Sequence, residues 1–192
     1  MNLFGEFFRE GFFHIVDIGA LDHILFILAV VAIYRISEWK KILWVITSFT
    51  IAHSVSLALS VLDIINIPSK TVELLIAFTI CYTCIENIFF RNHNRYRVYI
   101  TGFFGLIHGL GFSAALKSLF SAADLNLFET LLPFNLGIEC GQLVIITGIM
   151  IIFFVLYRYL KIRPVYVNLA ISIPVLLFSI YWIYDRLLIL MG

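Results

Sequence analysis

Long apolar stretches recur along the chain and are separated by short segments that carry most of its charges. Each stretch runs to about 20 residues, enough for a helix to cross the ~30 Å hydrocarbon core of a bilayer. The pattern predicts an all-α, polytopic membrane bundle. Its six transmembrane helices are expected at about residues 20–34, 42–61, 70–90, 98–118, 131–157 and 165–187.

The first residues follow a different pattern. Residues 3–17 are aromatic and amphipathic, so we expect them to lie at the membrane interface rather than to cross it. This segment carries Glu6 and Glu10 and lacks the basic region of a cleavable signal peptide, so we expect a complete chain that keeps its first helix. No soluble segment or long linker interrupts the apolar stretches, which predicts a single integral membrane domain over residues 1–192.

The distribution of Lys and Arg predicts the orientation of the bundle. Nine of the 13 fall in the first, third and fifth loops between the predicted spans, and four fall at the termini and in the other loops. Because cytoplasmic loops carry an excess of these residues, both termini are expected outside. The expected location is a bacterial inner (cytoplasmic) membrane, which the chain crosses several times.

Composition agrees with the pattern and excludes some functions. Hydrophobic residues make up 62% of the chain and charged residues 13%, about half the share of a soluble domain. A net charge of +1 without a basic cluster argues against nucleic-acid binding. All three cysteines fall in predicted spans, and the pair Cys81 and Cys84 is better explained as small buried side chains than as a metal or redox motif.

Ionisable residues within the spans carry the functional signal, because each costs roughly 2.5–3.5 kcal/mol at the bilayer centre. Assigning depths from the predicted orientation places four of the five histidines and several carboxylates in the outer half of the membrane. Imidazole and carboxylate together are typical ligands of zinc, nickel, cobalt or iron. The predicted metal ligands are His14, Asp22, His23, His53, His108 and Glu139.

Other polar side chains are expected to support these ligands or to continue a polar path: Asp17, Ser54, Glu73, Glu86, Asn87, Asn135 and Gln142. Simpler roles stay open for several of them. Asp22 and Glu73 lie where a helix-capping or first-turn carboxylate is favoured. Glu86 can equally pair with Arg91 or Arg95 at the inner interface.

The segment GFFGLIHGLGF at 102–112 surrounds His108 with glycines. Gly105 and Gly109 form a small-xxx-small face, which allows a neighbouring helix to approach closely. We therefore expect His108 to come near enough to His53 or Glu139 to share a ligand with them.

Five segments together resemble the successive signature segments of the HupE/UreJ family. They are GFFHIVDIGALDHILF at 11–26, TSFTIAHS at 47–54, VELLIAFTI at 72–80, FGLIHGLGF at 104–112 and FNLGIECGQ at 134–142. The resemblance implies transition-metal handling, because this family is described as nickel or cobalt permeases or accessory proteins. It implies a central element of His14, Asp22 and His23, with His53, His108 and Glu139 on the later segments. Seven residues separate His14 from Asp22 where the family has five, so His14 is expected to sit differently or Asp17 to replace it.

Two functions from different classes follow. One is a permease or metal-binding accessory protein for a divalent transition metal (Ni, Co or Zn). The other is an intramembrane metal-dependent hydrolase of the zinc type, open to the periplasmic side. Both imply contact with membrane lipid and a metal ion. The first function, a permease or accessory protein, is compatible with a homo-oligomer or with a metalloenzyme-maturation partner.

Overall fold

The computed structural model describes residues 3–90, 96–112 and 127–191, and this part of the chain is helical without a strand. Its α-helices are α1 (Leu3–Val16), α2 (Leu21–Ala32), α3 (Trp39–Val61), α4 (Ser69–Phe89), α5 (Tyr96–Gly111), α7 (Leu127–Arg158) and α8 (Pro164–Met191). Two short 3-10 turns, η1 (Ile18–Ala20) and η2 (Ile36–Glu38), precede α2 and α3. The all-helical prediction is confirmed over these residues.

Four stretches are long and apolar enough to cross a membrane: Ile36–Val61, Ser69–Phe89, Phe128–Arg158 and Pro164–Met191. They correspond to four of the six predicted spans. Helix α5 has 16 residues and covers part of the span expected at 98–118, whose last residues lie outside the described part. The chain is therefore a multi-pass membrane protein.

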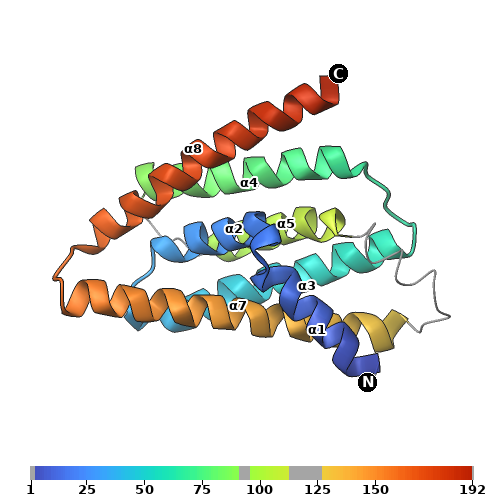
Figure 1. Ribbon diagram of the computed structural model, residues 1–192, viewed down its shortest axis with the longest axis horizontal. Coiled ribbons are helices and arrows are strands. Elements are labelled where there is room, and N and C mark those ends of the chain that lie inside the picture. Colours follow the sequence, from blue (N-terminus) through green and yellow to red (C-terminus); the bar gives the residue numbers. More distant parts are fainter. Residues whose placement is uncertain (1–2, 91–95, 113–126, 192) are drawn as a thin grey trace.

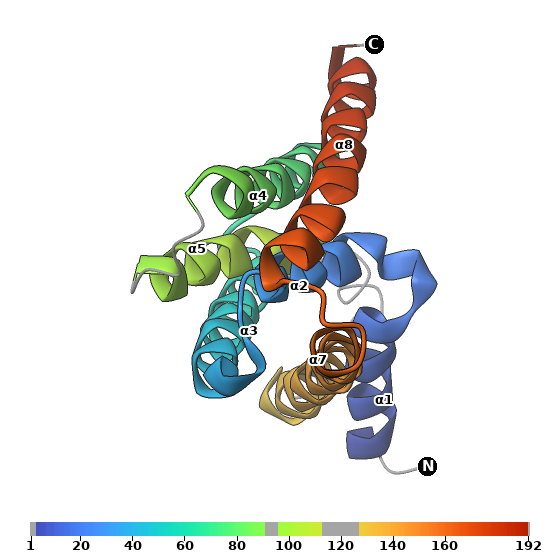
Figure 2. The same cartoon turned by 90° about the vertical axis from the view of Figure 1, so that its left-hand side faces the viewer.

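The N-terminal region differs from the expectation of an interfacial segment followed by a full span. Helix α2 has only 12 residues, about 18 Å of helix, which is shorter than the hydrocarbon core. Helices α1 and α2 are bent by 66° at a short break, and together they are long and apolar enough for one broken span. Figures 1 and 2 show α1 lying along the N-terminal half of α7 instead of standing apart from the bundle.

The helices pack most closely in three pairs, α3 with α5, α1 with α7 and α4 with α8, while α2 contacts several of them (Figure 2). Most of α2 is buried, including Phe26, Ile27 and Val31 at 1% exposure or less, as expected for a helix that is apolar on all sides. Helix α2 is thus the centre of the bundle.

The two ends of the bundle differ in what they contain. Both chain termini lie at one end, which we call the terminal end, together with the connection between α3 and α4 (Figure 1). The opposite end, which we call the basic end, contains the connections from α2 to α3 and from α7 to α8, and the adjoining ends of α4 and α5. The Lys and Arg residues of the first and fifth loops are at this end.

Glycines on α5 allow its backbone to contact α3 directly. A Cβ on Gly105 would overlap the backbone carbonyl of Phe49, and one on Gly109 would overlap the carbonyl of His53 and the hydroxyl of Ser56. The close approach predicted from the small-xxx-small spacing is therefore confirmed. It brings the helix of His108 against the helix of His53.

We expect Gly105→Ala to lower the melting temperature of the detergent-solubilised protein by several degrees. The added methyl must push the α3 backbone away, and overpacking of this kind costs about 1–3 kcal/mol. The matched control is Gly148→Ala on α7, where a Cβ meets nothing within 4 Å and alanine improves helix propensity. Equal melting temperatures for the two variants would contradict the role assigned to this contact.

Candidate metal centre

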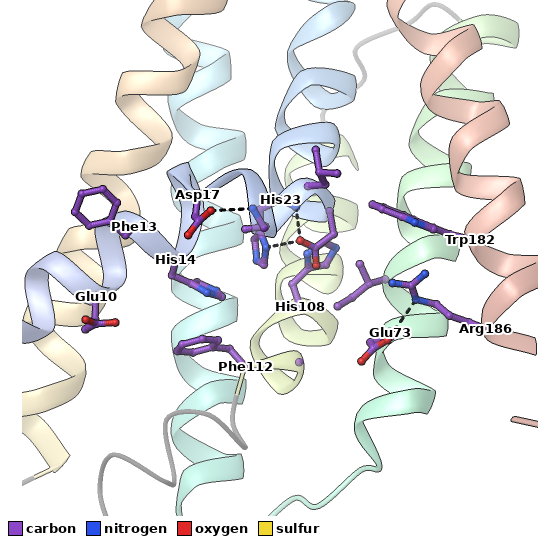
Figure 3. Close-up of a pocket in the computed structure, with 16 residues that line it drawn as sticks. Glu10, Phe13, His14, Asp17, His23, Glu73, His108, Phe112, Trp182 and Arg186 are labelled. Atoms are coloured by element: carbon purple, nitrogen blue, oxygen red, sulfur yellow. Dashed lines mark hydrogen bonds and ion pairs between the residues drawn. The ribbon is translucent and has the colours of Figure 1, made fainter. Parts of the chain in front are cut away.

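Four histidine side chains from four helices meet inside the bundle: His14 of α1, His23 of α2, His53 of α3 and His108 of α5. The ring centroid of His23 lies 4.8 Å from that of His14, 6.0 Å from that of His53 and 5.2 Å from that of His108. The ring centroids of His14 and His53 are 6.1 Å apart. Figure 3 shows His14, His23 and His108 pointing toward one another. We call these four residues the histidine cluster.

The break between α1 and α2 explains how His14 joins the cluster despite its long spacing from Asp22. Asp17 caps η1 by accepting a hydrogen bond from the Gly19 amide at 2.9 Å. The capped turn takes up the extra residues and redirects the chain, so that the last turn of α1 faces the first turn of α2. His14 therefore reaches the cluster itself, while the Asp17 carboxylate is engaged in the turn.

The end of α1 and the start of α2 add a favourable electrostatic field at the histidine cluster. His14 is in the last turn of α1, where the partial negative charge of the helix dipole favours a cation. Asp22 is in the first turn of α2, where the positive end of the dipole stabilises a carboxylate. A broken helix with both ends at a binding site is a common arrangement in ion-handling membrane proteins.

Hydrogen bonds set the orientation of two of the imidazoles. The Asp22 carboxylate accepts from Nδ1 of His23 at 3.1 Å. The Thr79 hydroxyl donates its proton to the Ile76 carbonyl, so at its 3.0 Å contact with His108 it must accept from Nε2. When each ring is neutral, its remaining nitrogen then carries a lone pair. This is the tautomer that a metal ligand needs.

Five ring nitrogens of the histidine cluster have no hydrogen-bond partner in the described part of the chain. Nε2 of His14, Nε2 of His23, both ring nitrogens of His53 and Nδ1 of His108 are buried, with no hydrogen-bond partner within the described ranges. An unsatisfied buried polar atom costs about 1–3 kcal/mol. Four such imidazoles side by side are costly in an apolar bundle unless a ligand binds them.

The distances suit a single ion. Ligand atoms of Asp22, His23 and His108 all lie within 4.8 Å of one another. Two nitrogens bound to one ion are at most about 4.2 Å apart, so shifts of under about 1 Å close this group around an ion. Among the described residues this group does not include His14 and His53, whose rings lie beside that of His23. The donor set therefore fits a transition metal.

A cavity of about 620 Å³ connects the cluster with the terminal end of the bundle. Its wall includes the carboxylates of Glu10, Asp17, Asp22 and Glu73 and, among the described residues, one cation, Arg186. Arg186 Nε lies 3.5 Å from a Glu73 oxygen (Figure 3), and its guanidinium lies 5.0 Å from the centre of the Trp182 ring. The excess of carboxylates favours the entry of cations.

Other predicted residues lie apart from the cluster. Glu139 accepts from Thr47 at 3.1 Å and Gln142 from Thr50 at 2.7 Å, both between α7 and α3, and neither lines the cavity. Ser54 donates to the Thr50 carbonyl. Asn135 Oδ1, on the same helix as Glu139, is buried with no partner in the described part.

Glu86 and Asn87 lie at the basic end, at the far end of α4 from the cavity. Glu86 pairs with Arg97 of α5 at 3.4 Å. The expected partners Arg91 and Arg95 lie outside the described residues, as does the fifth histidine, His93, so the pairing expected with them stays a prediction.

Several residues at the site were not singled out from the sequence. Glu10 shares a helical face with His14, four residues away, and this spacing was an available signal. Trp182 and Arg186 come from the last helix, which carries no motif of its own. The Thr79 contact with His108 joins positions 29 residues apart, so no local pattern reveals it.

Comparison with known proteins gives the family. Neither curated proteins nor solved structures contain a match to this chain. The sequence model of one family, described as HupE / UreJ protein, matches residues 1–186 of the 192. This match covers every residue of the histidine cluster and of the cavity wall, and the chain therefore belongs to the HupE/UreJ family.

Proposed function

We propose that this protein captures a divalent transition metal of the nickel or cobalt type from outside the membrane and delivers it inward, as a permease or as a membrane accessory protein. The observation that carries the proposal is the set of unpartnered ring nitrogens in the histidine cluster. Three of these imidazoles, His14, His23 and His108, line a cavity with an acidic wall, and His53 lies next to them. Together they make a site for a cation that prefers nitrogen ligands.

In this proposal His14, His23, His53 and His108 supply nitrogen ligands. Asp22 holds the His23 ring and offers an oxygen of its own. Glu139, the remaining predicted ligand, accepts from Thr47 between α7 and α3 and has no assigned role in this proposal. A metalloenzyme-maturation partner that receives the ion, or assembly as a homo-oligomer, is part of the same proposal.

The proposed topology has six crossings within a single membrane domain. The broken pair α1–α2 makes the first, and α3, α4, α5, α7 and α8 make the others. An even number of crossings agrees with the position of both termini at the same end (Figure 1). The Lys and Arg residues at the opposite end favour a cytoplasmic location for it, in a bacterial inner membrane. The cavity then faces outward.

A second candidate function is supported by the size of the cavity. A volume of about 620 Å³ is far more than one ion needs and is typical of pockets for organic molecules. A zinc-type ion at the cluster could activate water there, with Glu10 or Glu73 as a general base. An intramembrane hydrolase open to the outside is therefore the alternative.

Metal content provides the first test. We expect the purified protein to bind one Ni²⁺ or Co²⁺ per chain in calorimetry, and His23→Ala and His108→Ala each to weaken binding at least tenfold, because each removes an oriented ligand. His93→Ala changes the histidine of the third loop predicted from the sequence and serves as the control. Unaltered affinity in both cluster variants would contradict the proposed site.

Thr79→Val tests the orientation of His108. Valine keeps the shape of threonine but cannot accept the Nε2 hydrogen bond, so the ring loses its preferred tautomer. Losses of about 10–100-fold in metal affinity are typical when such a supporting partner is removed. The control is Thr147→Val on α7, whose hydroxyl bonds only its own helix. Equal affinities for the two variants would show that Thr79 does not orient the ligand.

Metal uptake into vesicles distinguishes the two candidate functions. Vesicles containing the protein and a trapped metal-sensitive dye are expected to respond to external Ni²⁺ or Co²⁺, and the His108→Ala variant is expected to lose this response. Firm retention of one ion without any uptake would instead support the hydrolase.

A further inference from the structure

A buried polar network closes the basic end of the bundle. Arg97, in the first turn of α5, is only 2% exposed. Its guanidinium pairs with Glu86 at 3.4 Å and donates to Asn87 Oδ1 at 2.8 Å and to the Val30 carbonyl at 3.4 Å. It also lies 5.6 Å from the centre of the Tyr34 ring. This arginine thus joins α5 to α4 and to the end of α2.

Asn87 extends the network to α8. Its Nδ2 donates to the Ala29 carbonyl at 2.6 Å and to Ser172 Oγ at 3.2 Å. Asn168 Nδ2 donates to the Asn87 carbonyl at 2.9 Å, and Ser172 donates to Asn168 Oδ1 at 2.9 Å. We call Glu86, Asn87, Arg97, Asn168 and Ser172 the inner network. It ties four helices together at one point.

Stability alone does not account for this arrangement. Burying an ion pair costs several kcal/mol of desolvation for each ion, and a well-packed apolar set often holds helices together as well or better. Polar contacts differ in that they can separate and rehydrate. A polar closure is therefore suited to a contact that must open.

A polar stripe on α4 leads from the histidine cluster to this network. Thr79, Thr83 and Asn87 are spaced four residues apart on one helix face, and each is 3% exposed or less. Thr79 contacts His108, Thr83 donates to the Thr79 carbonyl, and Asn87 belongs to the inner network. The stripe covers about 12 Å along the helix. It supplies the polar groups that an inward path requires.

The part of helix α8 that contacts the inner network has features that allow it to move. It packs mainly on α4, and its outer side is exposed along much of its length (Figure 2). Pro174 lies within the helix, two residues after Ser172, and a proline there removes one helical hydrogen bond and favours a kink. The part of α8 that carries Asn168 and Ser172 can therefore tilt away from α4.

We propose that the inner network is the inner gate of the metal path, closed in this structure, and that it opens when Asn168 and Ser172 of α8 and Arg97 of α5 separate from α4. The inference rests on the proposed function, since a gate implies passage from the histidine cluster along the α4 stripe. The wide cavity at the terminal end and the closed network at the basic end together describe an outward-facing state.

Cysteine accessibility tests the gate. The three native cysteines are free and are replaced by alanine, and Thr83→Cys places a single thiol on the stripe. A membrane-impermeant maleimide is applied to the basic end in oriented vesicles. We expect slow labelling with the network intact and about tenfold faster labelling after Glu86→Gln or Ser172→Ala, because each change removes a buried interaction of the closed state. Ni²⁺ affinity at the cluster is expected to stay unchanged.

The matched control is Ser179→Ala, a buried serine of the same helix that bonds only the Leu176 carbonyl. Unchanged labelling in both network variants, with Ni²⁺ affinity retained, would overturn the gate. Ser172→Ala removes a single hydroxyl and decides the question alone if Glu86→Gln does not fold. Metal uptake is measured separately on the unaltered protein, so failure of the permease proposal is distinguishable from failure of the gate.

Discussion

Imidazole rings buried in an apolar bundle need partners for two nitrogens each, and much of this structure follows from that requirement. Asp22 satisfies one nitrogen of His23 and Thr79 one nitrogen of His108. The glycine face of α5 brings His108 against α3, and the capped break after α1 brings in His14. In His23 and His108 the protein thus satisfies one nitrogen and leaves the other without a partner in the described part of the chain, and in His53 it leaves both without one. That division is expected of a site completed by a metal ion.

Helix α4 carries polar groups along its whole length, with the exposed Glu73 on the cavity wall, the buried Thr79 and Thr83 in the middle and Asn87 at the basic end. Lipid cannot satisfy such groups, so they must face other helices. Helix α8 covers α4 at both ends, through Arg186 and through Asn168. The pair α4–α8 therefore connects the cavity wall at the terminal end with the inner network at the basic end.

The sequence predicted the parts of this arrangement that depend on local spacing. Depth within each span indicated the four histidines, and the glycine spacing indicated the approach of α5 to α3. The position of α1 was not predictable in this way, because an interfacial helix and half of a broken span are both short and amphipathic. The pairing of Glu86 with Arg97 joins α4 to α5 and is a tertiary contact that no local pattern predicts. The contacts of Trp182 and Arg186 are purely tertiary and have no local pattern.

Release of the ion is the harder physical problem for a permease, since several nitrogen ligands together bind a transition metal firmly. The distribution of the cluster over the bundle offers a solution. His53 and His108 belong to the α3–α5 pair, His14 to the α1–α7 pair, and His23 to the central α2. Helices within a pair are held by extensive contacts, whereas motion between pairs divides the ligand set. A small relative movement therefore lowers the number of ligands and the affinity together. The four histidines lie outside the α4–α8 pair, so this loss of ligands is a separate step from the opening of the inner network.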